Sequence, residues 1–142
     1  MFIDQIAVFL ANQTGRLADV TAVLAEENVD IRAMSLAETE EYGVLRMIVD
    51  NPALAVEKLR EKGVAVRVTP VIAAKFGDEP GALNRVLKIL NDACVSVTYA
   101  YAFISPVGGG ACVVLRTENC GKAAAVLVEN GIELMKAEDI HK

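Results

Sequence analysis

The stretch that decides the fold occurs twice in the chain, as NQTGRL at residues 12–17 and as DEPGAL at residues 78–83. The glycines of the two copies, Gly15 and Gly81, lie 66 residues apart. An apolar run precedes each copy, and a helical spacing of apolar residues follows it. A repeat of this kind predicts two copies of one structural unit within the 142 residues.

The apolar periodicities within each copy follow one order, which is strand, helix, strand, strand, helix, strand. In the first copy we expect these elements at residues 3–10, 17–28, 30–38, 43–50, 52–63 and 64–69. In the second copy we expect them at residues 71–77, 81–93, 95–104, 111–117, 119–130 and 132–137. This is the order of the split β-α-β unit. We therefore predict an α+β protein of two tandem ferredoxin-like βαββαβ modules, residues 1–70 and 71–142, each an antiparallel sheet with both helices on one face.

The strands expected at 30–38 and 43–50 carry apolar residues on both sides. An antiparallel sheet with one face in water shows polar residues on that face. Two interpretations stay open: short strands are apolar throughout, or another subunit or the other half of the chain covers the open face. We expect a homodimer, which would cover it. Tyr99, Tyr101 and Phe103 line one side of a second-half strand, either as core residues or as a surface on which a ligand stacks.

The composition is that of a soluble globular protein, because 54% of the residues are hydrophobic and the formal net charge is −5. Phosphate backbones and anionic membranes repel such a chain, so we expect neither nucleic acid nor membrane as a partner. No apolar run approaches the roughly 20 residues of a spanning helix, and we expect no signal peptide. Cys94, Cys112 and Cys120 form no Cys-x-x-Cys pair and indicate reduced thiols in a cytoplasmic protein.

Groups for catalysis are scarce in this sequence. The only histidine is His141, one residue from the C-terminus, so a histidine base or catalytic triad has nothing to use. One histidine and three scattered cysteines do not make a metal site. We therefore predict that the protein is not an enzyme and holds neither a metal nor a cofactor.

Two short motifs admit both a structural and a chemical interpretation. Glycines 108–110 lack the spacing of a phosphate-binding loop, and a hairpin turn explains them better. Glu38, Glu40 and Glu41 lie at an expected hairpin tip, where they are either solvated or paired carboxylates for a divalent cation. We expect a solvated tip.

The junction between the first strand and the first helix has turn residues in both copies. Asn12 and Asp78 each stand three residues ahead of a glycine at the start of a helix. Unpaired backbone N–H groups and the positive end of the helix dipole suit a carboxylate there, and Gly15 or Gly81 lets a ligand approach the backbone closely. The side chain of Asn12 or Asp78 either accepts from the ligand's ammonium group or caps the helix.

These motifs resemble those of the ACT domain. The first turn of that family commonly reads Asp-x-Pro-Gly-x-Leu, which residues 78–83 match, and residues 12–17 are similar to a variant that begins with asparagine, with Thr14 in place of proline. The segment NVDI at residues 28–31 resembles the start of the family's second strand. The resemblance covers essentially the whole chain, as two tandem ACT modules with no catalytic domain.

The resemblance implies a sensor of small molecules, usually amino acids, that acts on metabolic enzymes. In this family the ligand lies at the seam between two modules, held by the first loop of one module and the start of the second strand of its neighbour. By position, one seam would comprise Asn12, Gln13, Thr14, Gly15, Arg16 and Leu17 with Cys94, Val95 and Ser96. The other would comprise Asp78, Glu79, Pro80, Gly81, Ala82 and Leu83 with Asn28, Val29 and Asp30.

We therefore expect a non-catalytic regulatory protein that binds a small amino acid, with the ligand carboxylate on the helix-start backbone at Gly15 or Gly81. One alternative is a ligand-free interaction module that pairs with a metabolic enzyme. A small enzyme on the same fold, such as an acylphosphatase, is a third alternative, although neither Arg16 nor Arg85 has the glycine pattern of that family's catalytic loop.

Overall fold

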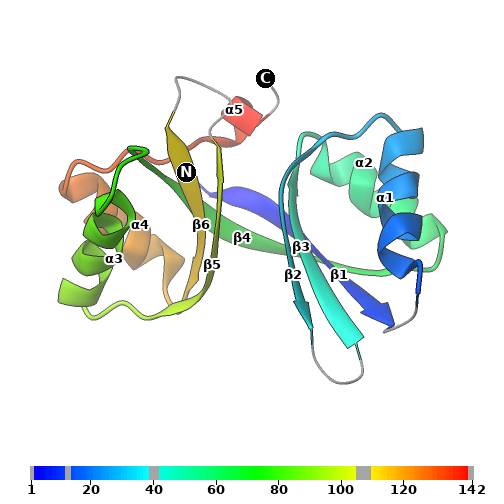
Figure 1. Ribbon diagram of the computed structural model, residues 1–142, viewed down its shortest axis with the longest axis horizontal. Coiled ribbons are helices and arrows are strands. Elements are labelled where there is room, and N and C mark those ends of the chain that lie inside the picture. Colours follow the sequence, from blue (N-terminus) through cyan, green and yellow to red (C-terminus); the bar gives the residue numbers. More distant parts are fainter. Residues whose placement is uncertain (1, 12–13, 39–41, 105–109, 141–142) are drawn as a thin grey trace. The chain divides into compact units, whose positions relative to one another are not determined.

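The computed structural model describes residues 2–11, 14–38, 42–104 and 110–140 (Figure 1). The predictions for several residues lie outside these ranges, namely those for Asn12, Gln13, Glu40, Glu41, Gly108, Gly109 and His141. The chain divides into two compact units, here called module 1 and module 2. Module 1 comprises Asp4–Thr69, and module 2 comprises Pro70–Ile140 and takes in Phe2 and Ile3.

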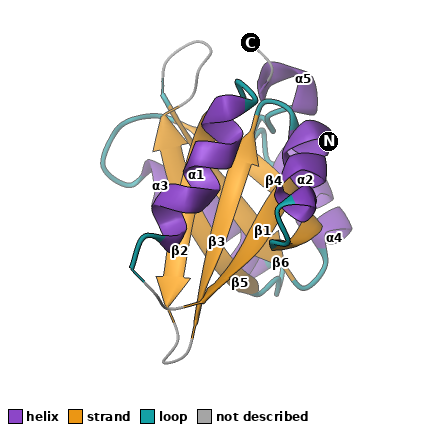
Figure 2. Cartoon of the chain, turned by 90° about the vertical axis from the view of Figure 1, so that its right-hand side faces the viewer, coloured by secondary structure: helices purple, strands orange, loops and turns teal. Residues whose placement is uncertain are grey.

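Module 1 has the predicted βαββαβ order. Its elements are β1 (Ile3–Ala11), α1 (Arg16–Glu26), β2 (Ile31–Glu38), β3 (Tyr42–Val49), α2 (Pro52–Glu61) and the first part of β4 (Ala65–Phe76). The hydrogen-bonded strand order is β2-β3-β1-β4, and β3 runs antiparallel to both β1 and β2. Figure 2 shows α1 in front of this sheet, on the face where α2 also packs. The ferredoxin-like fold class is thus confirmed.

Module 2 repeats this plan with the second part of β4 as its first strand. Its further elements are α3 (Ala82–Asp92), β5 (Val97–Ile104), β6 (Ala111–Thr117), α4 (Cys120–Glu129) and α5 (Ala137–Ile140). The strand order is β4-β6-β5, and β6 is antiparallel to both neighbours. Among the described helices of both modules, none is long and apolar enough to cross a membrane.

The strands predicted at 64–69 and 71–77 are one continuous strand, β4, and the boundary between the modules falls inside it at Pro70. The pairing of β4 with β6 begins at Ile72, so the missing N–H of Pro70 lies outside that ladder. Apart from Pro70 the stretch holds no turn residue, and β4 continues as one strand from module 1 into module 2.

The closing strand predicted for the second copy at 132–137 is largely wrong. Only Leu134 pairs with β4, through an isolated bridge to Ala74. An ion pair of 3.0 Å between Lys75 Nζ and Glu133 Oε1 flanks the bridge, and its hydrogen bond raises the pKa of Lys75. The side chain of Asp139 accepts a hydrogen bond from the N–H of Lys136, which starts the turn into α5 and ends the extended backbone.

Each module has its own apolar core between the sheet and its two long helices. In module 1, alternate residues of β1 point into the core, and Leu24 of α1 packs against them. In module 2, Leu90 of α3 takes the equivalent place 66 residues later. Both leucines are fully buried. The regular repeat in the sequence therefore corresponds to repeated core positions.

The aromatic stripe of the second half does not belong to the core of module 2. Tyr99, Tyr101 and Phe103 lie opposite Arg116, Val114 and Cys112 of β6, whereas the alternate β6 residues point into the core. All three aromatic side chains are half-buried on the face of the sheet away from α3 and α4. The interpretation of these residues as core packing was wrong.

Candidate functional site

The first helix of each module begins at a glycine. Gly15 and Gly81 are the N-cap residues of α1 and α3, with φ of 88° and 87°, the left-handed region in which glycine has no steric penalty. The second helices begin differently, because the side chains of Asn51 and Asn119 accept hydrogen bonds from the N–H of the third helical residue at 3.2 and 3.0 Å. A glycine N-cap has no such side chain, which leaves first-turn N–H groups to another acceptor.

These two helix starts also have free space in front of them. Beyond the adjoining residues of its own chain segment, a Cβ built on Gly15 or Gly81 would meet no atom of the described residues within 4 Å. The alternative prediction that Asp78 caps the helix is wrong, because Gly81 occupies the N-cap position. The same prediction for Asn12 lies outside the described residues.

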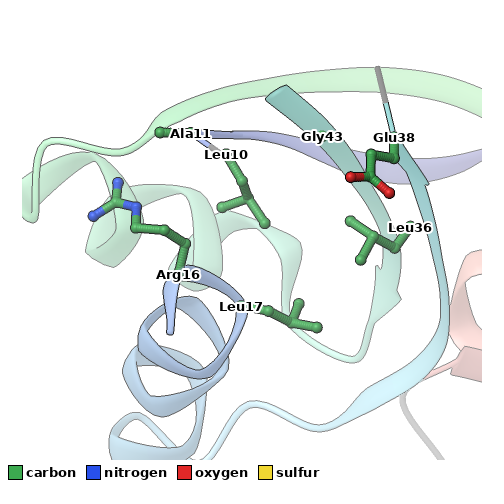
Figure 3. A pocket seen from close by; sticks show the side chains of 7 residues that line it. All are labelled: Leu10, Ala11, Arg16, Leu17, Leu36, Glu38 and Gly43. Carbon is green, nitrogen blue, oxygen red and sulfur yellow. The ribbon is translucent and has the colours of Figure 1, made fainter. Parts of the chain in front are cut away.

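A pocket of about 230 Å³ opens beside the start of α1 (Figure 3). The end of β1, the first turn of α1, the end of β2 and the start of β3 contribute its lining, which comprises Leu10, Ala11, Arg16, Leu17, Leu36, Glu38 and Gly43. Pockets for drug-sized ligands measure about 300–1,000 Å³, so this one suits a smaller metabolite. All of the lining belongs to module 1.

Among the residues that line this pocket, Arg16 has a buried hydrogen-bond donor without an acceptor. Its Nε is buried and has no hydrogen-bond partner among the described residues. Leaving a buried donor unpaired costs about 1–3 kcal/mol, and more for a charged group. Arg16 also lines a neighbouring pocket of about 260 Å³ along α1, together with Asp19, Glu26 and Lys62. A guanidinium presents several donors in a planar fork that matches a carboxylate, so an acidic ligand group would satisfy it.

Two predicted binding residues, Arg16 and Leu17, lie in the pocket, and Gly15 and Thr14 precede them directly. Glu38 was predicted to be solvated at a hairpin tip; its side chain is exposed and also lines the pocket. Four further lining residues were not predicted at all, namely Leu10, Ala11, Leu36 and Gly43. Strand register is the signal that could have identified these four residues. Leu10 pairs with Gly43, and Leu36 pairs with Leu45, on the helix-facing side of the sheet.

The residues predicted at the start of the second strand lie elsewhere in module 1. Asn28, Val29 and Asp30 precede β2, whereas Glu38 ends it, about 25 Å away at the rise of an extended strand. Val29 belongs to the core, and Asp30 forms an ion pair of 3.2 Å with Arg32. The partner predicted for these three residues is the segment 78–83 of a neighbouring module, and that pairing stays a prediction.

The equivalent segment of module 2, residues 94–96, is likewise divided between the core and the surface. Cys94 is exposed with φ of 58°, Val95 is a core residue, and Ser96 is exposed and accepts a backbone hydrogen bond from Glu118. The buried side chains of Val29 and Val95 are thus taken up by packing, which leaves only their backbone for a ligand.

Module 2 keeps the glycine of the first helix but has no counterpart of Arg16 or Glu38. Asp78, Glu79, Pro80 and Leu83 are exposed. Ala82, which is buried, stands where module 1 has Arg16. Ile104 pairs with Ala111 as Glu38 pairs with Gly43, so an apolar residue replaces the acid. The two modules therefore differ in charge at equivalent places.

Comparison with known proteins gives the family. The family model of the ACT domain pair matches residues 1–142. A search of curated proteins finds no match. Among solved structures, protein BT0572 from Bacteroides thetaiotaomicron is 38% identical with a TM-score of 0.93, covering 100% of this chain and 97% of its own.

More distant structures share the fold alone. The ligand-free regulatory subunit of aspartate kinase from Thermus thermophilus is 15% identical with a TM-score of 0.61, over 89% of this chain and 90% of its own. The corresponding subunit from Thermus flavus is 13% identical with a TM-score of 0.57, over the same shares. With a family match over the whole length and a relative at 38% identity, the chain belongs to the ACT domain pair family.

Proposed function

We propose that this ACT domain pair is a non-catalytic regulatory protein that binds a free amino acid at the start of α1. The ligand carboxylate lies on the backbone at Gly15 and beside Arg16. The buried, unpartnered Nε of Arg16 at the edge of an open pocket is the observation that carries the proposal. A carboxylate there would satisfy both the guanidinium and the first-turn N–H groups.

We assign the ligand to Gly15 rather than to Gly81 because the residues that follow these two glycines differ in charge. Both glycines present the positive end of a helix dipole, but that dipole amounts to only about half an elementary charge. Arg16 adds a full positive charge in module 1, whereas Ala82 adds none in module 2. We therefore assign one amino acid to each chain. Binding by Cys94, Val95 and Ser96, or by Asn28, Val29 and Asp30, stays a prediction.

A regulatory role is supported by the fold. Regulatory subunits of aspartate kinase share it. For this chain we propose a metabolic enzyme as the regulated partner and a homodimer as the assembly. The exposed side chains of Phe9, Met34 and Tyr42 supply apolar surface for such contacts in module 1.

Isothermal titration of the intact chain with each of the twenty amino acids tests the proposal. We expect at least one amino acid to bind with one molecule per chain, because only module 1 has the charged site. If none gives heat at millimolar concentration, the proposal is wrong and the ligand-free interaction module becomes the better explanation.

We expect Gly15→Ala to weaken amino-acid binding about tenfold, because the added Cβ occupies the space through which a ligand reaches the backbone. The variant also loses about 1–2 kcal/mol of folding free energy, since alanine is strained at a φ of 88°. Gly81→Ala is the matched control, because it carries the same strain at a φ of 87°. Calorimetry and thermal unfolding of both variants separate the two effects, and equal binding by both would place the site elsewhere.

A further inference from the structure

The face of the module 1 sheet that lies away from α1 and α2 has two exposed aromatic side chains near the end of β1. Phe9 pairs with Val44 and Ala11 pairs with Tyr42, so Phe9 and Tyr42 lie on the same face in diagonal positions. They are 39% and 50% exposed. An open pocket of about 450 Å³ lies against them, and Leu10 and Ala11 complete its described lining.

A cation lies beside these aromatic residues. The guanidinium carbon of Arg67, on β4, is 5.9 Å from the centre of the Phe9 ring, a distance at which a cation and an aromatic face attract each other. Arg67 is exposed and forms no ion pair with any described residue. A guanidinium held in this way offers its planar set of donors to a carboxylate from outside the chain.

We propose that this Phe9 surface, which comprises Phe9, Ala11, Tyr42 and Arg67, binds a segment of a partner protein in which a carboxylate side chain stands beside an aliphatic one. The carboxylate pairs with Arg67, and the aliphatic side chain enters the pocket against the two rings. The partner is the metabolic enzyme of the proposed function, and for its partner this inference rests on that function. It needs neither Arg16 nor an amino-acid ligand.

Module 2 has groups of this kind at the equivalent place, and its own chain supplies them. Lys75 of β4 stands where module 1 has Phe9, at the same position of the strand pairing. The hydrogen bond with Glu133 and, less strongly, the charge of Asp139 raise the pKa of Lys75. Ile140, which follows Asp139, is only 2% exposed. A cation, two carboxylates and a buried aliphatic side chain therefore occur close together in the folded module 2.

Module 1 has no segment of its own to do the same, because β4 does not turn back after Arg67 but runs on to Phe76. Arg67 therefore lacks a carboxylate among the described residues, and Phe9 stays exposed. An acidic segment complements this cation, whereas a basic segment is repelled by it. An aliphatic side chain in the pocket gains from the burial of apolar surface.

A peptide with the sequence of residues 133–140, ELMKAEDI, is the probe, because it carries the acidic and aliphatic residues found at Lys75 in module 2. Blocking both ends removes the terminal charges. In an NMR titration of the full chain we expect the amide signals of Phe9, Ala11, Tyr42 and Arg67 to shift, with a dissociation constant in the millimolar range. The neutral peptide QLMKAQNI should bind about threefold more weakly, because exposed ion pairs contribute modestly to affinity.

Arg67→Gln should lower the affinity for the acidic peptide to that for the neutral peptide and leave the latter unchanged. Phe9→Ala should weaken binding of both peptides about fivefold, since the apolar contact is common to them. Arg85→Gln is the control: it removes the same charge from an exposed position on α3 and should alter neither affinity.

Failures of the two proposals give different results. If neither peptide binds, if both bind equally, or if the shifts lie only outside the Phe9 surface, this inference is overturned while amino-acid binding stands. If the chain associates with itself in sedimentation and Arg67→Gln abolishes that association, the occupant is a second copy, and the inference is likewise overturned. Failure of the proposed function would appear instead as an absence of amino-acid binding in calorimetry, which the peptide titration does not measure.

Discussion

Arg16→Met is expected to weaken amino-acid binding by about a hundredfold. Truncating one partner of a desolvated charge pair costs about 2–5 kcal/mol, and each 1.4 kcal/mol is a factor of ten in affinity. Methionine keeps the length and the apolar stem of arginine, so the pocket wall is retained while the donors are lost. Calorimetry with the amino acid that binds the unmodified chain measures the change.

The same substitution is expected to stabilise the ligand-free protein. Without ligand, the buried Nε of Arg16 has no partner among the described residues, and the folded state bears that desolvation cost. Its removal should raise the free energy of unfolding by about 1 kcal/mol, or the melting temperature by several degrees. Weaker binding together with higher stability is typical of a group held for function, because a purely structural arginine would lower stability when removed.

Arg85→Met is the matched control, because Arg85 lies exposed on α3 of module 2. We expect neither binding nor stability to change by more than about 0.5 kcal/mol, as for ordinary surface substitutions. Unchanged binding by Arg16→Met would mean that the ligand carboxylate lies elsewhere.

The fold could be predicted from the sequence because its signals are local. Helical spacing after Gly15 and after Gly81, together with the repeat of 66 residues, was enough to give the element order of module 1 and that of module 2 as far as α4. The signal for the start of α1 is also local, because a glycine in the left-handed region both ends the loop and begins the helix. The boundary predicted after residue 70 falls inside β4, and nothing local in the sequence showed that the strand continues through Pro70.

The pocket could not be predicted in the same way, because strand register brings its residues together. Leu36 and Glu38 are 20 and 22 positions from Arg16 in the sequence and reach it only through the pairing of β2 with β3 and of β3 with β1. A register change of one residue would turn every side chain to the opposite face. Strand pairing makes Ala111 the equivalent of Gly43, because Phe76 pairs with Ala111 as Leu10 pairs with Gly43.

Leu24→Ala and Leu90→Ala are expected to destabilise different modules by similar amounts. Leu24 is fully buried in the core of module 1 and Leu90 in that of module 2. Truncation of a buried leucine to alanine costs about 2–5 kcal/mol, a large share of the about 5–15 kcal/mol that stabilises a typical protein. Thermal and denaturant unfolding, followed by circular dichroism, measure both losses.

The ligand distinguishes the two variants, because it stabilises only the module that holds Arg16. An excess of about 100 times the dissociation constant adds about 2.7 kcal/mol to the folded state that binds it. In Leu24→Ala the weakened module contains the site, so the ligand should raise the first unfolding transition. In Leu90→Ala the first transition belongs to module 2 and should stay where it is. An equal rise in both variants would contradict the assignment of the ligand to module 1 alone, because module 2 would then share in the binding energy.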